Sequence, residues 1–439
     1  IEAASDVVVN NTFTMTQGTF NTGTRSLSGT ANFVATGGDV QFQKTGVTIP
    51  ETTGSVTCTG GMLTINGAGA QTIRDTPGAE EYHGLLLDGS GTKTLLGDID
   101  VDSILTIDAG VILDVSGSNY SMSVEGNWNN SGTFNEQAGT VTFDGSSAIT
   151  ISASAEETFH NLTVNNSTPA SAITLNEDVR VSNQVTFTAG HIVSSAANTF
   201  KMSSGATVAA VVDGSHVIGP MEKDMAVASL FEFPIGDGVA YRRAGLTPAG
   251  ATATTYQIEY VQDKYPVADP TVIDHISEFE YWMIERTAGT EDAAVRLSWD
   301  ANSLVDNSAT LAVVNFNGTT DWPDVCSGCS TGADFIEMGA DFTFATTKYF
   351  TLGCNTPGDN PLVGTRFSIG GGGNWSDGNK WSYTDGGAAC SCTPTASSDV
   401  TIKTGETLNI DVAASANTIV VEGGACLLYT SDAADEYSG

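Results

Sequence analysis

The chain has 439 residues, 40% of them hydrophobic, and a net charge of −35 that comes from 51 acidic against 16 basic side chains. This charge argues against nucleic acid and anionic membrane surfaces as partners, because both attract basic faces. The apolar content argues against global disorder, no apolar run approaches the roughly 18 residues of a membrane span, and the length suggests about three domains.

The first half of the chain contains an internal repeat. Three segments align, each beginning with Asp, ending with Gly 12 positions later and carrying apolar residues at alternating positions: residues 6–18, 98–110 and 178–190. Other landmarks recur as well, since Tyr82-His83-Gly84-Leu85 corresponds to Phe159-His160-Asn161-Leu162. A repeated unit of this size indicates a fold in which similar units stack on one another.

Apolar and polar residues alternate within the repeats, as in Val141-Thr142-Phe143 and Ile173-Thr174-Leu175. In a strand this alternation sends the apolar side chains to one face, and the Gly, Asn, Ser and Asp residues between strands favour turns. We therefore predict an all-β fold that begins with a repetitive parallel β-helix, or β-solenoid, over residues 1–212. An array of antiparallel sandwiches is the alternative, because short strands with turn residues are typical of both.

The central part of the chain has a different pattern. Aromatic-rich strand candidates follow one another without the repeat, at residues 231–235, 256–260, 281–284, 295–299, 311–314 and 349–352. Such strands are typical of a β-sandwich, so we predict an immunoglobulin-like sandwich over residues 213–355.

The C-terminal part begins with a segment rich in Pro and Gly, which predicts a linker over residues 356–372. After the glycine run at 370–373, two-residue alternation returns at 399–402 and 407–410. We predict that residues 373–425 are the start of a second β-helical module.

Both ends of the sequence are unusual. The chain starts at Ile1 without an initiator Met or a signal peptide, so we expect a fragment of a longer protein. Residues 426–436 resemble the in-frame translation of a transposase-type sequencing adapter over eleven consecutive residues. We expect residues 426–439 to be an artefact, and a natural acidic tail is the alternative.

Three motifs together resemble those of modular, adhesin-like bacterial surface proteins that are exported by the type IX secretion system. They are the G-T-V-T-F-D-G unit at residues 139–145, the F-P-I-G segment at 233–236 and the G-N-W-S…W-S segment at 373–382. The resemblance covers most of residues 1–425 and is one of architecture. It implies export, an extracellular or cell-surface location, and an adhesive or structural role.

Three carboxylates in the second repeat copy are the metal candidates. Asp98, Asp100 and Asp102 would project from one face of a strand and could hold calcium, which prefers oxygen ligands. In the other two copies only the first Asp of the three recurs. A solvated strand face is therefore the favoured interpretation, calcium is the alternative, and no other cofactor is predicted.

The cysteines indicate disulfide chemistry. Cys326 and Cys329 form a C-x-x-C pair in a Ser- and Gly-rich loop, for which a loop disulfide is favoured over a redox motif or half a zinc site. Cys354, Cys390 and Cys392 are further disulfide candidates, with no connectivity assigned. Cys390 and Cys392 are too close in sequence to pair comfortably with each other.

Catalytic motifs are missing from the sequence. None of the five histidines belongs to an H-E-x-x-H motif, and neither a G-x-S-x-G elbow nor a phosphate-binding G-x-x-x-x-G-K sequence occurs. Two acids that meet in the fold would suffice for a glycosidase, but 51 acids make accidental pairs common. Trp322, beside Asp321 and Pro323 in a loop, is the candidate for a ligand contact, although packing is the favoured interpretation.

These observations predict a non-enzymatic, secreted or cell-surface protein with a structural or adhesive role, which presents a repetitive β surface. Extracellular glycans or other surface proteins are the expected partners. The alternative is an extracellular polysaccharide-active enzyme or its carbohydrate-binding module, because β-helices also host such enzymes.

Overall fold

The structure is a computed structural model that describes residues 3–429, with gaps at 169–172, 267–270, 357–359, 361, 363–364, 383–384, 387–388, 390–392, 395–397 and 417. The regular structure of the described residues is β, apart from two short 3₁₀ helices, Ala301–Ser303 (η1) and Gly378–Lys380 (η2). The all-β prediction is confirmed. Among these same residues, no helix is long and apolar enough to cross a membrane.

The chain divides into two compact units. The first unit comprises the described residues of Ile1–Val261, Met283–Ala293 and Phe342–Thr347. The second unit comprises those of Gln262–Trp282, Ala294–Asp341 and Lys348–Gly439.

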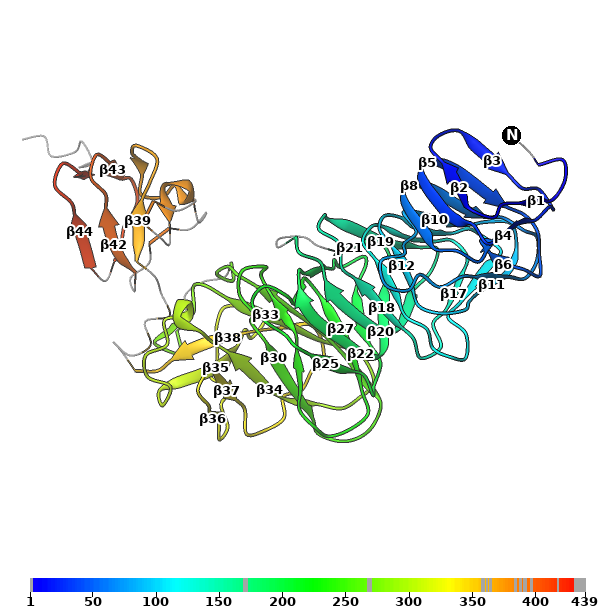
Figure 1. Ribbon diagram of the computed structural model, residues 1–439. Helices are drawn as coiled ribbons and strands as arrows, with labels where there is room; N and C mark the ends of the chain where they lie inside the picture. The colour runs from blue at the N-terminus through cyan, green and yellow to red at the C-terminus, as the bar shows by residue number, and fades with distance from the viewer. Residues whose placement is uncertain are drawn as a thin grey trace, which may run out of the picture. The chain divides into compact units, whose positions relative to one another are not determined.

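The first unit contains a parallel β-solenoid, as predicted (Figure 1). One sheet takes one strand from each successive coil, and every step along it is parallel. Its strands are β2 (Thr12–Met15), β5 (Asn32–Phe42), β8 (Val56–Ile65), β10 (Gly84–Leu87), β13 (Leu105–Ile107), β16 (Trp128–Asn130), β19 (Ile149–Ala153), β21 (Ile173–Leu175), β23 (Ile192–Val193), β26 (Val217–Ile218) and β29 (Ile235–Gly236).

Two further parallel stacks form other sides of the coils. The larger consists of β12 (Ile99–Val101), β15 (Met122–Val124), β18 (Thr140–Phe143), β20 (Glu157–Asn165), β22 (Val179–Ala189), β24 (Phe200–Met202) and β27 (Met221–Met225). The smaller consists of β6 (Thr48–Ile49), β9 (Gln71–Ile73), β11 (Gly91–Leu95), β14 (Val111–Asp114) and β17 (Thr133–Asn135).

In the register of these strands, side chains of the same kind lie above one another in successive coils. One buried column runs through the larger stack as Val101, Val124, Phe143, Val164 and Phe187. The neighbouring column, which faces outward, contains Asp100, Ser123, Thr142, Thr163 and Thr186. The alternation of each strand thus places apolar side chains in a continuous core that each coil shares with the next.

The solenoid is followed by antiparallel pairing. β27 pairs in antiparallel register with β31 (Thr254–Val261), and β28 (Phe231–Phe233) pairs in the same way with β30 (Ala244–Pro248). The last parallel step reaches β29, so the stack extends past Val212, where the sequence repeat ends. Antiparallel strands do occupy this region, but their pairing does not establish an immunoglobulin-like topology.

The second unit has its own apolar clusters. In one, β35 (Leu311–Asn315) pairs with β38 (Lys348–Cys354), and Val314 is buried together with Phe316 and Trp322. In the other, Trp375 and Trp381 pack with residues of β42 (Asp399–Ile402) and β43 (Thr407–Ile410).

The predicted second β-helical module is present in this unit. β42 lies between β39 (Arg366–Ser368) and β44 (Thr418–Val421), and β43 lies between β40 (Gly373–Asn374) and β45 (Cys426–Tyr429), with parallel pairing throughout. The first of these strands, β39, falls within the predicted linker, and β45 falls within the segment that resembles an adapter. Residues 430–439 lie outside the described residues.

Candidate functional site

The three aspartates proposed as calcium ligands have separate roles in the solenoid. The backbone N–H of Ser121 donates to Asp98 Oδ1 at 2.8 Å, just before the next coil starts β15. The first Asp of the other two repeat copies accepts an equivalent hydrogen bond. Ser26 N–H donates to Asp6 at 2.9 Å, and Thr199 N–H donates to Asp178 at 2.7 Å. The recurring Asp therefore links one coil to the next.

Asp100 and Asp102 belong to a group of carboxylates that repel one another. Burial, together with the charge of Glu81 and a hydrogen bond with it, raises the pKa of Asp102 to about 6. Partial desolvation, together with neighbouring carboxylates in the case of Asp100 and Glu125, also raises the pKa of Asp100, Glu125 and Asp144. Across the described part of the chain, no three His, Cys, Asp or Glu side chains form a group that could hold a metal ion. The structure therefore does not assemble Asp98, Asp100 and Asp102 into a calcium site.

Trp322 lies in the interior of the second unit. Its side chain is fully buried, and its ring centroid lies 5.4 Å from those of Tyr265 and Phe316. A fully buried ring has no face to offer a ligand, so Trp322 is a packing residue.

The cysteines lie in different surroundings. Cys326 and Cys329 are joined by a disulfide, with their Cα atoms 5.0 Å apart. Cys354 is buried at the end of β38 and is a free thiol with respect to the described residues. Cys390 and Cys392 lie outside the described residues.

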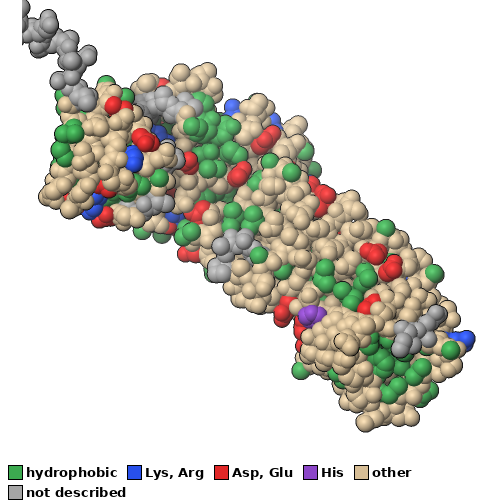
Figure 2. All heavy atoms as spheres, turned by 90° about the horizontal axis from the view of Figure 1, so that it is seen from above, with side chains coloured by type: hydrophobic (Ala, Val, Ile, Leu, Met, Phe, Trp, Pro, Cys, Tyr) green, Lys and Arg blue, Asp and Glu red, His purple; other side chains and the backbone are tan. Residues whose placement is uncertain are grey.

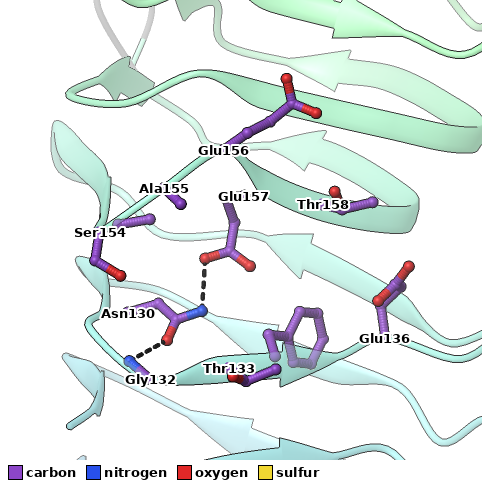
Figure 3. A pocket seen from close by; sticks show the side chains of 11 residues that line it. Asn130, Gly132, Thr133, Glu136, Ser154, Ala155, Glu156, Glu157 and Thr158 are labelled. Atoms are coloured by element: carbon purple, nitrogen blue, oxygen red, sulfur yellow. Dashed lines mark hydrogen bonds between the residues drawn. The ribbon is translucent and has the colours of Figure 1, made fainter. Parts of the chain in front are cut away.

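A polar cavity of about 250 Å³ opens beside Glu157 in the solenoid (Figure 3). Glu157 is the first residue of β20 and shares its inward orientation with Phe159. Across the coils it pairs with Val179, whose own partner is Phe200. A carboxyl group therefore occupies a position that the next coils fill with apolar side chains.

Neighbouring polar groups stabilise this carboxyl in the core. Asn130 Nδ2 donates to Glu157 Oε2 at 2.8 Å, and Trp128 Nε1 donates to the same oxygen at 3.1 Å. Glu157 is only 4% exposed, and burial raises its pKa to about 7 despite hydrogen bonds from Asn130, Trp128 and the backbone of Thr158, which lower it. The negative charge of Glu136 also raises the pKa of Glu157. Glu157 is thus largely a neutral carboxylic acid up to about neutral pH.

The rest of the cavity lining is mixed in character. Glu136 and Glu156 also line the cavity, and Figure 3 shows the carboxyl of Glu156 directed away from that of Glu157. Glu156 is paired with Arg180 at 2.6 Å and with Lys201 at 3.2 Å. The remaining lining consists of the Phe134 ring, small residues and the hydroxyls of Thr133, Ser154 and Thr158. The cavity therefore offers hydrogen-bond donors, acceptors and one aromatic ring.

One feature of the sequence indicates this site, although it belongs to no known motif. In Glu157-Thr158-Phe159 the charged residue falls on the apolar phase of the alternation. A charged side chain at an inward position must find polar partners, which points to a polar feature in the core. Its partners Trp128 and Asn130, almost 30 residues earlier, are set by the stacking of the coils.

Two buried histidines form a second polar feature. The rings of His191 and His216 lie on adjacent coils with centroids 4.4 Å apart. Burial lowers the pKa of both, that of His216 to about 4. The N–H of Gly238 donates to His216 Nε2 at 3.1 Å, so this ring is neutral and integrated into the core.

Comparison with protein-family models, with curated proteins and with solved structures yields no match.

Proposed function

We propose that this chain belongs to a secreted or cell-surface protein with a structural or adhesive, non-enzymatic role. The observation that carries the proposal is the parallel stack of coils, in which each coil is covered by its neighbours. Such a stack extends a lateral surface without requiring a larger core. The outward column of Ser123, Thr142, Thr163 and Thr186 repeats one kind of polar side chain along that surface.

The charge and the cysteines support an extracellular setting. On the face seen in Figure 2, acidic side chains are scattered over the surface and do not form one patch, as expected for a surface that faces solvent. The disulfide between Cys326 and Cys329 is a bond that persists in oxidising compartments. Together with the resemblance to type IX-exported surface proteins, these features favour glycans or other surface proteins as partners.

Binding without turnover is the test of this role. The chain, immobilised on beads, should retain cells or bind immobilised glycans and surface proteins, and it should release no reducing ends from polysaccharides. Failure to bind any of these surfaces would contradict the adhesive role.

A second candidate function, polysaccharide cleavage, is favoured by one observation. Glu157 combines a pKa of about 7 with a neighbouring carboxylate, Glu136, and glycosidases use such a pair as acid and base or nucleophile. Release of reducing ends by the chain, abolished by Glu157→Gln, would establish this function in place of the non-enzymatic one.

A further inference from the structure

We propose that the cavity beside Glu157 is a binding site for one sugar residue of a neutral glycan. The proposal rests on the adhesive role proposed above and names its ligand class. It follows from the size of the cavity, its charge and the hydrogen-bonding groups that line it.

The size of the cavity restricts the ligand to a small unit. Its volume of about 250 Å³ lies just below the range of about 300–1,000 Å³ that holds drug-sized ligands. One monosaccharide ring is a unit of suitable size, and the rest of a glycan chain would extend along the outside of the coils. The cavity opens to the surface, since Ser154, Ala155 and Glu156 on its rim are exposed.

The cavity lining disfavours an anion and does not form a calcium site. An anion would meet the carboxylate of Glu136, while Glu156 is already paired with Arg180 and Lys201. Calcium takes about six to eight oxygen ligands, and the described side chains provide no group that could hold a metal ion. An uncharged ligand with several hydroxyl groups fits this environment best.

The hydrogen-bonding groups match those of a sugar. Asn130 and Trp128 both donate to Oε2 of Glu157, and a neutral carboxyl group has in addition an O–H of its own to donate. That O–H can donate to a sugar oxygen, while the Glu136 carboxylate can accept from a sugar hydroxyl. Phe134, whose ring packs against Trp128 at 4.9 Å, lines the same cavity and provides an apolar contact for the carbon atoms of the sugar.

The direct test is binding of methyl pyranosides to the full chain. Methyl glycosides of glucose, galactose, mannose and N-acetylglucosamine serve as probes in saturation-transfer NMR at pH 6 and pH 9. We expect at least one to bind at pH 6 and to bind about tenfold more weakly at pH 9, because ionised Glu157 can no longer donate.

Three variants separate the pocket from the rest of the surface. In Glu157→Gln, the amide oxygen still accepts from Asn130 and Trp128, and the NH₂ group remains a donor at all pH values. Binding of the pyranoside probes to this variant should therefore not depend on pH. Ala155→Met should fill the opening and abolish binding, since Ala155 is an exposed lining residue. Glu125→Gln, an exposed carboxyl outside the lining, is the matched control and should bind like the parent chain. Circular dichroism spectra verify that each variant is folded.

The results separate the pocket from the adhesive role. The proposed sugar site would be contradicted if none of the four probes bound. It would also be contradicted if probe binding to Glu157→Gln depended on pH in the same way as binding to the parent chain. If the chain still binds immobilised glycans or cells in either case, the adhesive role stands and only the pocket fails. Loss of all surface binding would contradict the adhesive role itself.

Discussion

Buried polar side chains are the residues that distinguish this solenoid from a simple apolar stack. Lys93 is fully buried, and its Nζ donates to Gly67 O at 2.7 Å and to Gln71 Oε1 at 2.6 Å. Glu157 is buried in a comparable way with Asn130 and Trp128 as donors. Both of these buried groups are compensated by partners from an adjacent coil, as a low-dielectric interior requires.

The ionisation of Glu157 should make stability depend on pH. Its pKa is about 7 in the folded chain and about 4.5 when unfolded, so the neutral acid is favoured by folding. Stability from this group is fully present below pH 4.5 and is lost as the pH rises through 7, at a cost of about 3 kcal/mol. When the free energy of unfolding is measured with urea between pH 5 and pH 8, Glu157→Gln should remove this part of its decline with rising pH. An unchanged decline in the variant would show that Glu157 does not titrate in this range.

At the scale of elements, the coils are joined through recurring contacts at their turns. The first Asp of each repeat copy accepts the backbone N–H that precedes the next strand, as Asp98 does from Ser121. Close backbone approach is a second such contact. Gly145 lies so near the preceding coil that a Cβ atom would meet the carbonyl oxygen of Glu125 at 2.1 Å.

Removing the Asp98 carboxyl should weaken one coil junction. Asp98→Ala leaves the Ser121 N–H without its acceptor, which costs about 1 kcal/mol. Asp98→Asn keeps a side-chain oxygen and should retain most of the stability. Chemical denaturation of the two variants measures the difference, and equal losses in both would contradict the linking role.

A methyl group at Gly145 should be far more disruptive. Gly145→Ala forces the carbonyl of Glu125 to move, and we expect a loss of more than about 2 kcal/mol. Gly117→Ala is the matched control, because a Cβ there meets no atom within 4 Å. Thermal melts followed by circular dichroism should separate the two variants. Similar melting temperatures would show that the coils tolerate a wider spacing at Gly145.

At the scale of the whole molecule, the excess of acid is the dominant property. A net charge of −35 over 439 residues makes the chain repel itself, and only 16 basic side chains are present to offset it. Several of these are used in ion pairs on the solenoid, such as Arg180 with Glu156 and Lys201 with Asp178. The remaining acidic charge stays unscreened at low ionic strength.

Added salt should therefore stabilise the chain. The melting temperature should rise as sodium chloride increases from low to physiological concentration, because screening weakens repulsion between exposed carboxylates. Sucrose at the same osmolality is the control for effects that are not ionic. A fall in melting temperature with salt would mean that the ion pairs outweigh the repulsion.

The β class and the presence of a stacked repeat follow from the amino-acid sequence alone. Alternation in Val141-Thr142-Phe143 and the recurring Asp are local features, and strand formation follows from local spacing and side-chain shape. The tertiary structure decided what these residues do. Asp98 became a link between coils, Trp322 a core residue and Glu157 the buried wall of a cavity. Asp98 and Glu157 depend on partners about 20 to 30 residues away in the chain, which the stacking of one coil on the next brings into contact, whereas Trp322 depends on the packing of the second unit.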